Sequence, residues 1–454
     1  MSNKLQAGFA RLDITPPMGI PVIGYFLVRK AEGVLDNLEV NALALRHGEN
    51  TVLLLSIDKC ELSRKNNDII KNAISKKTGV QTDAIFVHCT HTHTGPGFTL
   101  AGGDDEESKQ MVIDYEKFLV TRCVDASVFA IEDLKPAKMG YAVGNAPDIA
   151  FIRRFRMKDG SIKTNPGVNN PDIVAPIGEV DERVNVLRFE REGGETIVLA
   201  NFGDHPDTVG GNKISGDWPT LTRHVFERAI DNAKCVVFNG AQGDVNHVKV
   251  NPTAGDFNDM FNDFDGCSRG YGHAKHMANV VACAIMQVYA KVNYIDVDGI
   301  EFMQREYQIP SNKPTPEELP LARKYNDLHN AGRDDEIPYT AMMLTTVVAE
   351  AARMVRLADA PDTFPLLFSA IKIGNVALFG VPGEPFTGVG RAIKEAEGYD
   401  LVLPCCLVNG AEGYYPMQDA YDEGGYEARS SSFKAGVAER IIDAGLEMLK
   451  DLRK

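Results

Sequence analysis

Hydrophobic residues in this chain gather in short runs, separated by polar loops and by stretches in which apolar residues recur every three to four positions. The β-like runs, each followed by a polar loop containing Gly or Pro, are TVLLLSID (51–58), DAIFVHCT (83–90), TIVLANFGD (196–204), CVVFNGAQGD (235–244), NVALFGVPGE (375–384) and DLVLPCCLVNG (400–410). The helical patterns cover Asn66 to Lys77 (stopped by Gly79), Ser108 to Leu134, Trp218 to Asn232, Ala274 to Ala290, Pro385 to Glu397 and Ser432 to Asp451. This alternation predicts an α/β fold with mixed β-sheets flanked by helices.

Nothing in the pattern divides the chain into separate units. There is no long linker, low-complexity stretch or internal repeat, so we expect one domain over residues 1–454. Three polar, turn-rich segments are predicted to be surface loops, namely Ala101 to Glu107, Asn251 to Gly272 and Pro310 to Glu336. The acidic, Phe-containing run from Asp256 to Asp265 is predicted to shape the mouth of a binding site.

Composition narrows the class of protein. The chain is 44% hydrophobic and 24% charged, and no apolar run approaches the ~20 residues of a membrane span, so we expect no membrane insertion. No export signal opens the sequence, and eight cysteines without a C-x-x-C pair predict reduced, buried thiols, which together indicate a cytoplasmic protein. The net charge of −15 without a basic stripe argues against a nucleic-acid partner, whereas a homo-oligomer is compatible with the sequence.

The most informative segment is HCTHTHTGPGF, which follows a strand-like run. His91 and His93 lie two residues apart, so on an extended chain both imidazoles point to the same side. Neutral imidazole is a common zinc ligand, and a neighbouring histidine can bind metal or move a proton. The alternative is that these histidines are polar residues that simply end a strand.

Other reactive residues also follow strands, at the edge where ligands bind in open α/β sheets. His205 lies in GDHPDTVGG, Glu384 in VPGEPF, and Tyr414 with Tyr415 in NGAEGYYPM. Each has a structural alternative, respectively a loop histidine, a carboxylate favouring a helix N-terminus, and packing tyrosines. The loop GDVNHV, which contains Asn246, adds backbone amides and an acid, or forms an ordinary turn.

Taken in order, these segments resemble the catalytic domain of the neutral ceramidase family, including its shorter bacterial relatives. The resemblance runs from GFARLDITPP to about Ser432, and THTHTGPG is similar to the T-H-T-H-S-G-P of the family. It implies Zn²⁺ held by His91, His205, Glu384 and Tyr414. It also implies proton transfer by His93, stabilisation of the oxyanion by Tyr426 and a pocket lined by Arg153.

Two departures from the family bear on the substrate. Asn246 stands where the family's G-D-V-S-P loop has a serine, which excludes a serine nucleophile at this position but leaves zinc-activated water possible. The chain also ends soon after the tyrosine loop, so we expect no C-terminal β-sandwich domain of the kind that completes ceramidases. Both departures favour a small substrate over ceramide.

These observations lead to one leading function and three alternatives. The sequence predicts a zinc-dependent hydrolase that cleaves an amide bond of a small or N-acylated substrate through zinc-activated water. One alternative is a zinc lactonase or esterase acting on a small sugar-acid-type substrate. Another is an amidohydrolase barrel, although its H-x-H step usually lies on the first strand. The third is a non-catalytic metal- or ligand-binding protein.

Overall fold

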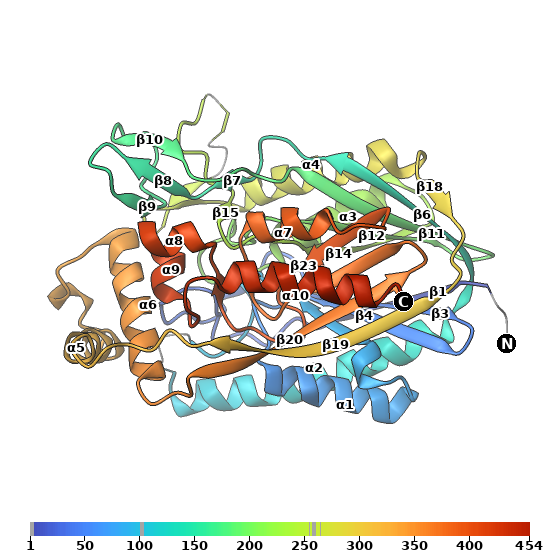
Figure 1. Ribbon diagram of the computed structural model, residues 1–454, viewed down its shortest axis with the longest axis horizontal. Coiled ribbons are helices and arrows are strands. Elements are labelled where there is room, and N and C mark those ends of the chain that lie inside the picture. The colour runs from blue at the N-terminus through green and yellow to red at the C-terminus, as the bar shows by residue number, and fades with distance from the viewer. Residues whose placement is uncertain (1–3, 100–103, 254, 257–259, 264) are drawn as a thin grey trace.

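The computed structural model describes residues 4–99, 104–253, 255–256, 260–263 and 265–454 (Figure 1). Its larger sheet has nine strands, in the order β14-β12-β11-β6-β1-β3-β4-β5 with β18 also paired to β6. These strands are β1 Gln6–Asp13, β3 Glu39–His47, β4 Asn50–Ile57, β5 Ile85–Cys89, β6 Lys135–Asn145, β11 Arg183–Arg191, β12 Thr196–Phe202, β14 Ala233–Asn239 and β18 Asn293–Ile295. Only the outer pairs β4–β5 and β12–β14 are parallel.

A second sheet has the order β19-β20-β21-β23, in which β21 and β23 are parallel. Its strands are β19 Ile300–Pro310, β20 Thr363–Ile373, β21 Val376–Gly380 and β23 Leu401–Cys405. The shorter ladders pair β2 Gly33–Val34 with β13 Lys213–Ile214, β7 Phe151–Ile152 with β15 Val245–Asn246, β8 Arg154–Met157 with both β9 Ile162–Thr164 and β10 Ile173–Pro176, β16 Phe261–Asn262 with β17 Ser268–Arg269, and β22 Glu384–Pro385 with β24 Tyr414–Tyr415.

Helices cover both sheets, as Figure 1 shows. Helices α1 (Arg64–Thr78) and α2 (Glu106–Glu132) pack together, with α2 against β1 and β3, whereas α3 (Asp217–Ala229) and α4 (Tyr271–Tyr289) pack at the β14–β6 side. Helices α7 (Thr387–Lys394) and α10 (Val437–Asp451) lie on the second sheet. The remaining helices are α5 Leu319–Asn330, α6 Ala341–Leu357, α8 Gln418–Glu423, α9 Tyr426–Ser430 and the 3₁₀ turns Thr82–Ala84 and Asp334–Glu336. Within the described residues, no helix is long and apolar enough to cross a membrane.

The two ends of the large sheet meet through the segment that follows β23. Phe86 of β5 and Phe238 of β14 have ring centroids 5.9 Å apart. Cys406 N donates to Asn239 O at 3.1 Å, and Asn409 N donates to Val87 O at 2.8 Å. The carboxyl ends of strands from both sheets therefore face one region, which is where the candidate residues lie.

The predicted α/β class with mixed sheets is confirmed. All six β-like runs are strands, and α1 begins after its cap Ser63 and ends at Gly79, which adopts φ 78°. The antiparallel strands β1, β3, β6 and β11 of the large sheet were not predicted. In β1, β6 and β11, partly exposed positions interrupt the buried ones. The sequence pattern therefore identified the strands that lead to the site better than those of the sheet centre.

The prediction of a loop over Pro310 to Glu336 is wrong, because this segment contains α5. Only Ala322 and Leu328 of α5 are buried, and the helix packs mainly on α6, so few of its positions are constrained to be apolar. The segment from Ala101 to Glu107 lies partly outside the described residues, and its last two residues begin α2. The segment from Asn251 to Gly272 also has positions outside the described residues, and it contains the two-stranded β16–β17 ladder.

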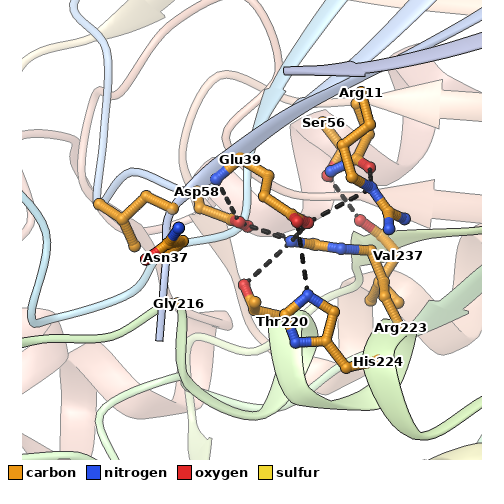
Figure 2. Close-up of polar contacts among 12 residues, drawn as sticks. Arg11, Asn37, Glu39, Ser56, Asp58, Gly216, Thr220, Arg223, His224 and Val237 are labelled. Carbon is orange, nitrogen blue, oxygen red and sulfur yellow. Dashed lines mark hydrogen bonds and ion pairs between the residues drawn. The ribbon is translucent and has the colours of Figure 1, made fainter. Parts of the chain in front are cut away.

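A largely buried ion-pair network joins α3 to β1, to β3 and to the end of β4 (Figure 2). Arg223 of α3 donates to Asp58 Oδ1 at 3.1 Å and to Glu39 Oε2 at 3.0 Å. Arg11 also pairs with Glu39, at 3.3 Å. Burying charges is costly unless they are paired and hydrogen-bonded, as they are here. The network therefore fixes the end of β4, from which the chain enters the candidate site.

Candidate metal centre

His91 follows β5 in a strained backbone conformation. Its φ of 76° is left-handed, which a non-glycine residue adopts only when its surroundings hold it there. Its Nδ1 lies 2.9 Å from the carbonyl oxygen of Cys60, which can only accept a hydrogen bond. The Nδ1 therefore carries the proton, so that the lone pair of Nε2 is available to a metal.

His205 follows β12 and is oriented in the same way. Its Nδ1 lies 3.4 Å from the carbonyl oxygen of Gln242, and its Nε2 lies 3.2 Å from Nε2 of His91. Strands β5 and β12 are far apart in the sheet order, but β5 packs on β14, the neighbour of β12, and this brings the two histidines together. The Nε2 atoms of both rings consequently face the same point.

Glu384 completes this cluster from the turn after β21. Its Oε2 lies 3.2 Å from Nε2 of His91 and 3.7 Å from Nε2 of His205. Gln242 Nε2 donates to the same oxygen at 3.3 Å, so Gln242 holds two members of the cluster. One ligand atom from each of His91, His205 and Glu384 lies within 4.8 Å of the other two, and all three residues are buried.

This donor set fits a metal ion, and zinc in particular. Ligands about 2.0–2.1 Å from zinc in a tetrahedron lie about 3.3 Å from one another, close to the spacing found here. Burial alone would lower the pKa of His91, but the Glu384 carboxylate raises it well above its ordinary value. The buried carboxylate thus draws a positive charge to this point, and a divalent cation supplies that charge while accepting the lone pairs.

Strand pairing places the adjacent tyrosines Tyr414 and Tyr415 on different faces of the β22–β24 ladder. In the parallel ladder β22–β24, Tyr414 pairs with Glu384 and Tyr415 pairs with Pro385, so the tyrosine side chains alternate between faces. The Tyr414 ring stacks at 6.4 Å from that of His205, whereas the Tyr415 hydroxyl donates to Pro382 O at 2.9 Å. Tyr414 is therefore the tyrosine on the side of the metal cluster.

His93 lies next to the cluster but outside the His91–His205–Glu384 group. Its Nε2 is 3.2 Å from Nε2 of His91, and its ring packs 5.1 Å from that of Tyr25. A Cβ atom on Gly24, whose φ is 119°, would lie 2.7 Å from His93, so only glycine allows this contact. Burial lowers the pKa of His93 well below its ordinary value, which keeps the imidazole neutral.

Arg153 and Tyr426 lie on the other side of Tyr414. Arg153 donates to Glu427 Oε1 at 2.7 Å and to Gly243 O at 2.8 Å, and its guanidinium stands 5.4 Å over the Tyr414 ring. The Tyr426 ring lies edge-on to Tyr414 at 5.5 Å. Arg153 therefore lies beside the cluster while it forms a buried ion pair with Glu427.

A small cavity of about 40 Å³ adjoins the cluster. Its lining includes His93, Arg153, His205, Asp207, Tyr414 and Tyr426. A larger cavity of about 480 Å³ shares Asn165, Asp265, Met342 and Tyr426 with it. The seven residues expected from the sequence therefore occupy one region, with a narrow inner space and a wider approach.

Asp207 is a site residue that sequence reasoning missed. Its Oδ1 lies 3.2 Å from Nδ1 of His247, and its Oδ2 lies 3.4 Å from Nη2 of Arg269. Burial would raise the pKa of Asp207, but its bond with His247 and the nearby cations lower it well below its ordinary value. Asp207 follows His205 by two residues, the same spacing that singled out His93, so this signal was present in the sequence.

The predicted mouth segment from Asp256 to Asp265 is described only in part. Its last residue, Asp265, lines both cavities and accepts from Arg269 Nη1 at 2.7 Å. Residues 257–259 and 264 lie outside the described residues. Met342 and Thr345 of α6 also line the inner cavity. The sequence patterns did not indicate either residue.

Comparison with known proteins concerns the fold. No family model matches the chain. The structure is similar to neutral ceramidase from Pseudomonas aeruginosa, with a TM-score of 0.71 and 16% sequence identity, over 100% of this chain and 75% of that one. It is also similar to a ceramidase complexed with C2, with a TM-score of 0.69 and 16% identity, over 100% of this chain and 76% of that one. The chain therefore has a neutral-ceramidase-like fold.

Proposed function

We propose that this protein is a zinc-dependent hydrolase that cleaves the amide bond of a small N-acylated substrate. The main support for this proposal is that His91 Nε2, His205 Nε2 and the Glu384 carboxylate converge on one point. The Nδ1 atoms of both histidines are bound to backbone carbonyls. Tyr414, which lies beside Glu384 in the β22–β24 ladder, is the proposed fourth ligand. The ceramidase-like fold supports the same reaction class, although a shared fold alone does not fix function.

The proposed chemistry divides between the metal and the surrounding side chains. Zinc bound by this set supplies a Lewis acid and lowers the pKa of water towards ~7. His93 accepts the proton of the attacking water and delivers it to the departing nitrogen, giving a carboxylic acid and an amine. Amides depend on this delivery more than esters do, because an amine is the poorer leaving group.

Tyr426 and Arg153 are proposed to stabilise the oxyanion. Burial raises the pKa of the Tyr426 hydroxyl above its ordinary value, so it remains a hydrogen-bond donor at neutral pH. Arg153 keeps a buried positive charge at the same wall of the cavity, held by Glu427. Donors fixed before the reaction favour the charge that develops in the transition state.

The inner cavity supports a small substrate. A cavity needs at least ~10–15 Å³ to hold one water molecule, so about 40 Å³ admits only a few non-hydrogen atoms beside the cluster. The rest of a substrate would lie in the wider approach. We accordingly favour a short acyl group over a long lipid chain.

A hydrolysis screen tests this function. Zinc-loaded protein is assayed with short N-acyl amines, esters, lactones and short-chain ceramides, with His93→Ala as the catalytic variant and Tyr415→Phe as its control. We expect amide cleavage that falls about 10²–10⁴-fold in His93→Ala and stays near wild type in Tyr415→Phe. Faster lactone or ester cleavage would support the alternative hydrolase, robust ceramide cleavage would contradict the small substrate, and full zinc occupancy without hydrolysis would indicate a binding protein.

We also propose a cytoplasmic location. All eight cysteines are free, and all but Cys283 are buried, which matches a reducing compartment. Thiol titration of the freshly isolated, denatured protein should return eight free thiols. Fewer thiols, with disulfides found by mass spectrometry, would contradict this location.

A further inference from the structure

Asn246, which replaces the serine of the resembling family, has a fixed amide orientation. It lies in β15, where it pairs with Phe151, and its side chain is buried. The backbone N–H of Val248 donates to Asn246 Oδ1 at 3.1 Å. Because a backbone N–H can only donate, the atom that faces it is the oxygen, and Nδ2 must point the other way.

The orientation of the Asn246 side-chain amide determines that of the Asn165 amide. Asn246 Nδ2 donates to Asn165 Oδ1 at 3.0 Å, so the Asn165 oxygen faces Asn246 and its own Nδ2 faces away. Asn165 adopts φ 46°, a conformation that asparagine tolerates, and its backbone N–H donates to Arg153 O at 2.8 Å. Both the backbone and the side chain of Asn165 are therefore held in place.

Asn165 stands where the two cavities join. It lines the inner cavity together with His93 and His205, and it also lines the outer cavity. Its Nδ2 makes no hydrogen bond to another residue within the described part of the chain. Two N–H hydrogens thus point away from Asn246 with no partner among the described residues, at the junction of the two cavities.

We propose that Asn165 binds the substrate by donating a hydrogen bond from Nδ2 to an acceptor oxygen, and that Asn246 is the positioning residue that sets this polarity. The inference rests on the proposed function, because it concerns the same site. It narrows the substrate class to N-acyl compounds that carry an ether, carbonyl or hydroxyl oxygen near the scissile amide. Compounds with hydrocarbon at that position leave the donor unpaired and bind more weakly.

The Asn246→Asp variant reverses this polarity without touching the substrate. One oxygen of the new carboxylate still accepts from Val248 N, and the other can only accept, so the Asn165 amide turns and presents Oδ1 to the cavity. Asn165→Leu removes the donor while keeping a similar size. Asn170→Asp is the matched control, because Asn170 lies in the same loop, binds Pro166 O at 2.7 Å and lines neither cavity.

The test compares amides that differ by an acceptor oxygen. On the amine side the pair is N-(2-methoxyethyl)acetamide and N-butylacetamide, and on the acyl side it is N-propyl-2-methoxyacetamide and N-propylbutanamide. Dissociation constants are measured by ligand-observed NMR with zinc-loaded protein, and hydrolysis is followed separately. Binding tests the donor and hydrolysis tests the proposed function, so failure of one is distinguishable from failure of the other.

We expect wild type and Asn170→Asp to bind the oxygen-containing member of at least one pair about tenfold more tightly, the scale of one hydrogen bond. Asn246→Asp and Asn165→Leu should both lose this preference while keeping their zinc content and melting temperature. The combined variant should show no further loss, because both changes act on one donor. Equal binding of both pairs by wild type, or a preference retained in both variants, would overturn the proposal.

Discussion

Two buried polar clusters in this protein differ in how their charges are balanced. In the network of Figure 2, Arg223 lies between Asp58 and Glu39, with Arg11 as a further cation, so carboxylates and cations both come from the chain. In the candidate metal centre, His91, His205 and Glu384 all direct lone pairs or negative charge at one point. The first cluster is balanced by side-chain cations of the chain, whereas the second directs donor atoms of three side chains at a single point.

This difference separates a structural from a functional use of buried polar groups. A self-neutralising ion-pair network fixes backbone positions, whereas donors that converge without a cation are suited to bind one. The two clusters are also connected along the chain. Asp58 accepts from the backbone of Glu39 at 2.9 Å, and two residues later Cys60 O binds His91. The network thus supports the element that orients a proposed ligand.

The largest expected effect comes from removing a proposed metal ligand. His205→Ala should lower kcat/KM for the best amide by about 10³-fold or more, the scale of losing a principal electrostatic stabiliser. Circular dichroism should show that the fold is kept, because the substitution removes only one side chain of the cluster. Amide hydrolysis within tenfold of wild type would show that His205 has no such role.

Breaking the ion-pair network should affect stability more than chemistry. Arg223→Leu leaves Asp58 and Glu39 without their buried cation, and we expect a loss of about 3 kcal/mol in the free energy of unfolding. Denaturant titration measures this loss. Arg305→Leu is the control, since Arg305 bonds Glu447 and Asp451 at a more exposed position and should cost under about 1 kcal/mol. Similar costs for both variants would contradict the comparison.

The network should also make stability depend on acid pH. Burial would raise the pKa of Glu39, but His224, Arg223 and Arg11 lower it from 4.5 to about 2. Since the pKa of Glu39 is lower in the folded state than in the unfolded state, its ionised carboxylate stabilises the fold above pH 4.5. This stabilisation is lost as the pH falls through about 2.

Acid titration of the Glu39→Gln variant measures this contribution. Between pH 4.5 and about 2, we expect the free energy of unfolding to fall for both proteins. The fall should be larger in wild type than in Glu39→Gln, by roughly 2 kcal/mol. Parallel curves for the two proteins would show that Glu39 is not the group responsible.

The smallest effect distinguishes the two adjacent tyrosines. Tyr414→Phe removes a hydroxyl on the side of Glu384, and we expect kcat/KM to fall about tenfold, equivalent to about 1.4 kcal/mol. Tyr415→Phe removes only the bond to Pro382 O and should cost about 1 kcal/mol of stability with little change in activity. Steady-state kinetics and thermal melts compare them, and the reverse pattern would assign the role to Tyr415.

Much of the proposed site could be predicted from sequence because its members follow strands. His91, His205 and Glu384 each come directly after a β-like run, and strands that end at one edge bring such residues together. In the sequence only the family resemblance favours Tyr414 over Tyr415, whereas the structure distinguishes the two by the alternation of side chains in β24.

The residues that were missed depend on contacts that local patterns do not encode. Asn165 reaches the cavities through a left-handed turn and a partner 81 residues away, and nothing in its own segment signals this. Glu39 and Arg223 form a largely buried pair across 184 positions, which no local pattern in the sequence indicates. Helix α6 carries Met342 to the cavity, yet it was not predicted as a helix at all.

Zinc stoichiometry measures whether His205 takes part in binding a metal ion. Wild type, His205→Ala and Tyr415→Phe are dialysed against zinc, freed of excess metal and analysed by inductively coupled plasma mass spectrometry. We expect about one zinc per chain in wild type and Tyr415→Phe, and almost none in folded His205→Ala. Amide hydrolysis by metal-free wild type, or one zinc per chain retained in His205→Ala, would contradict the proposal.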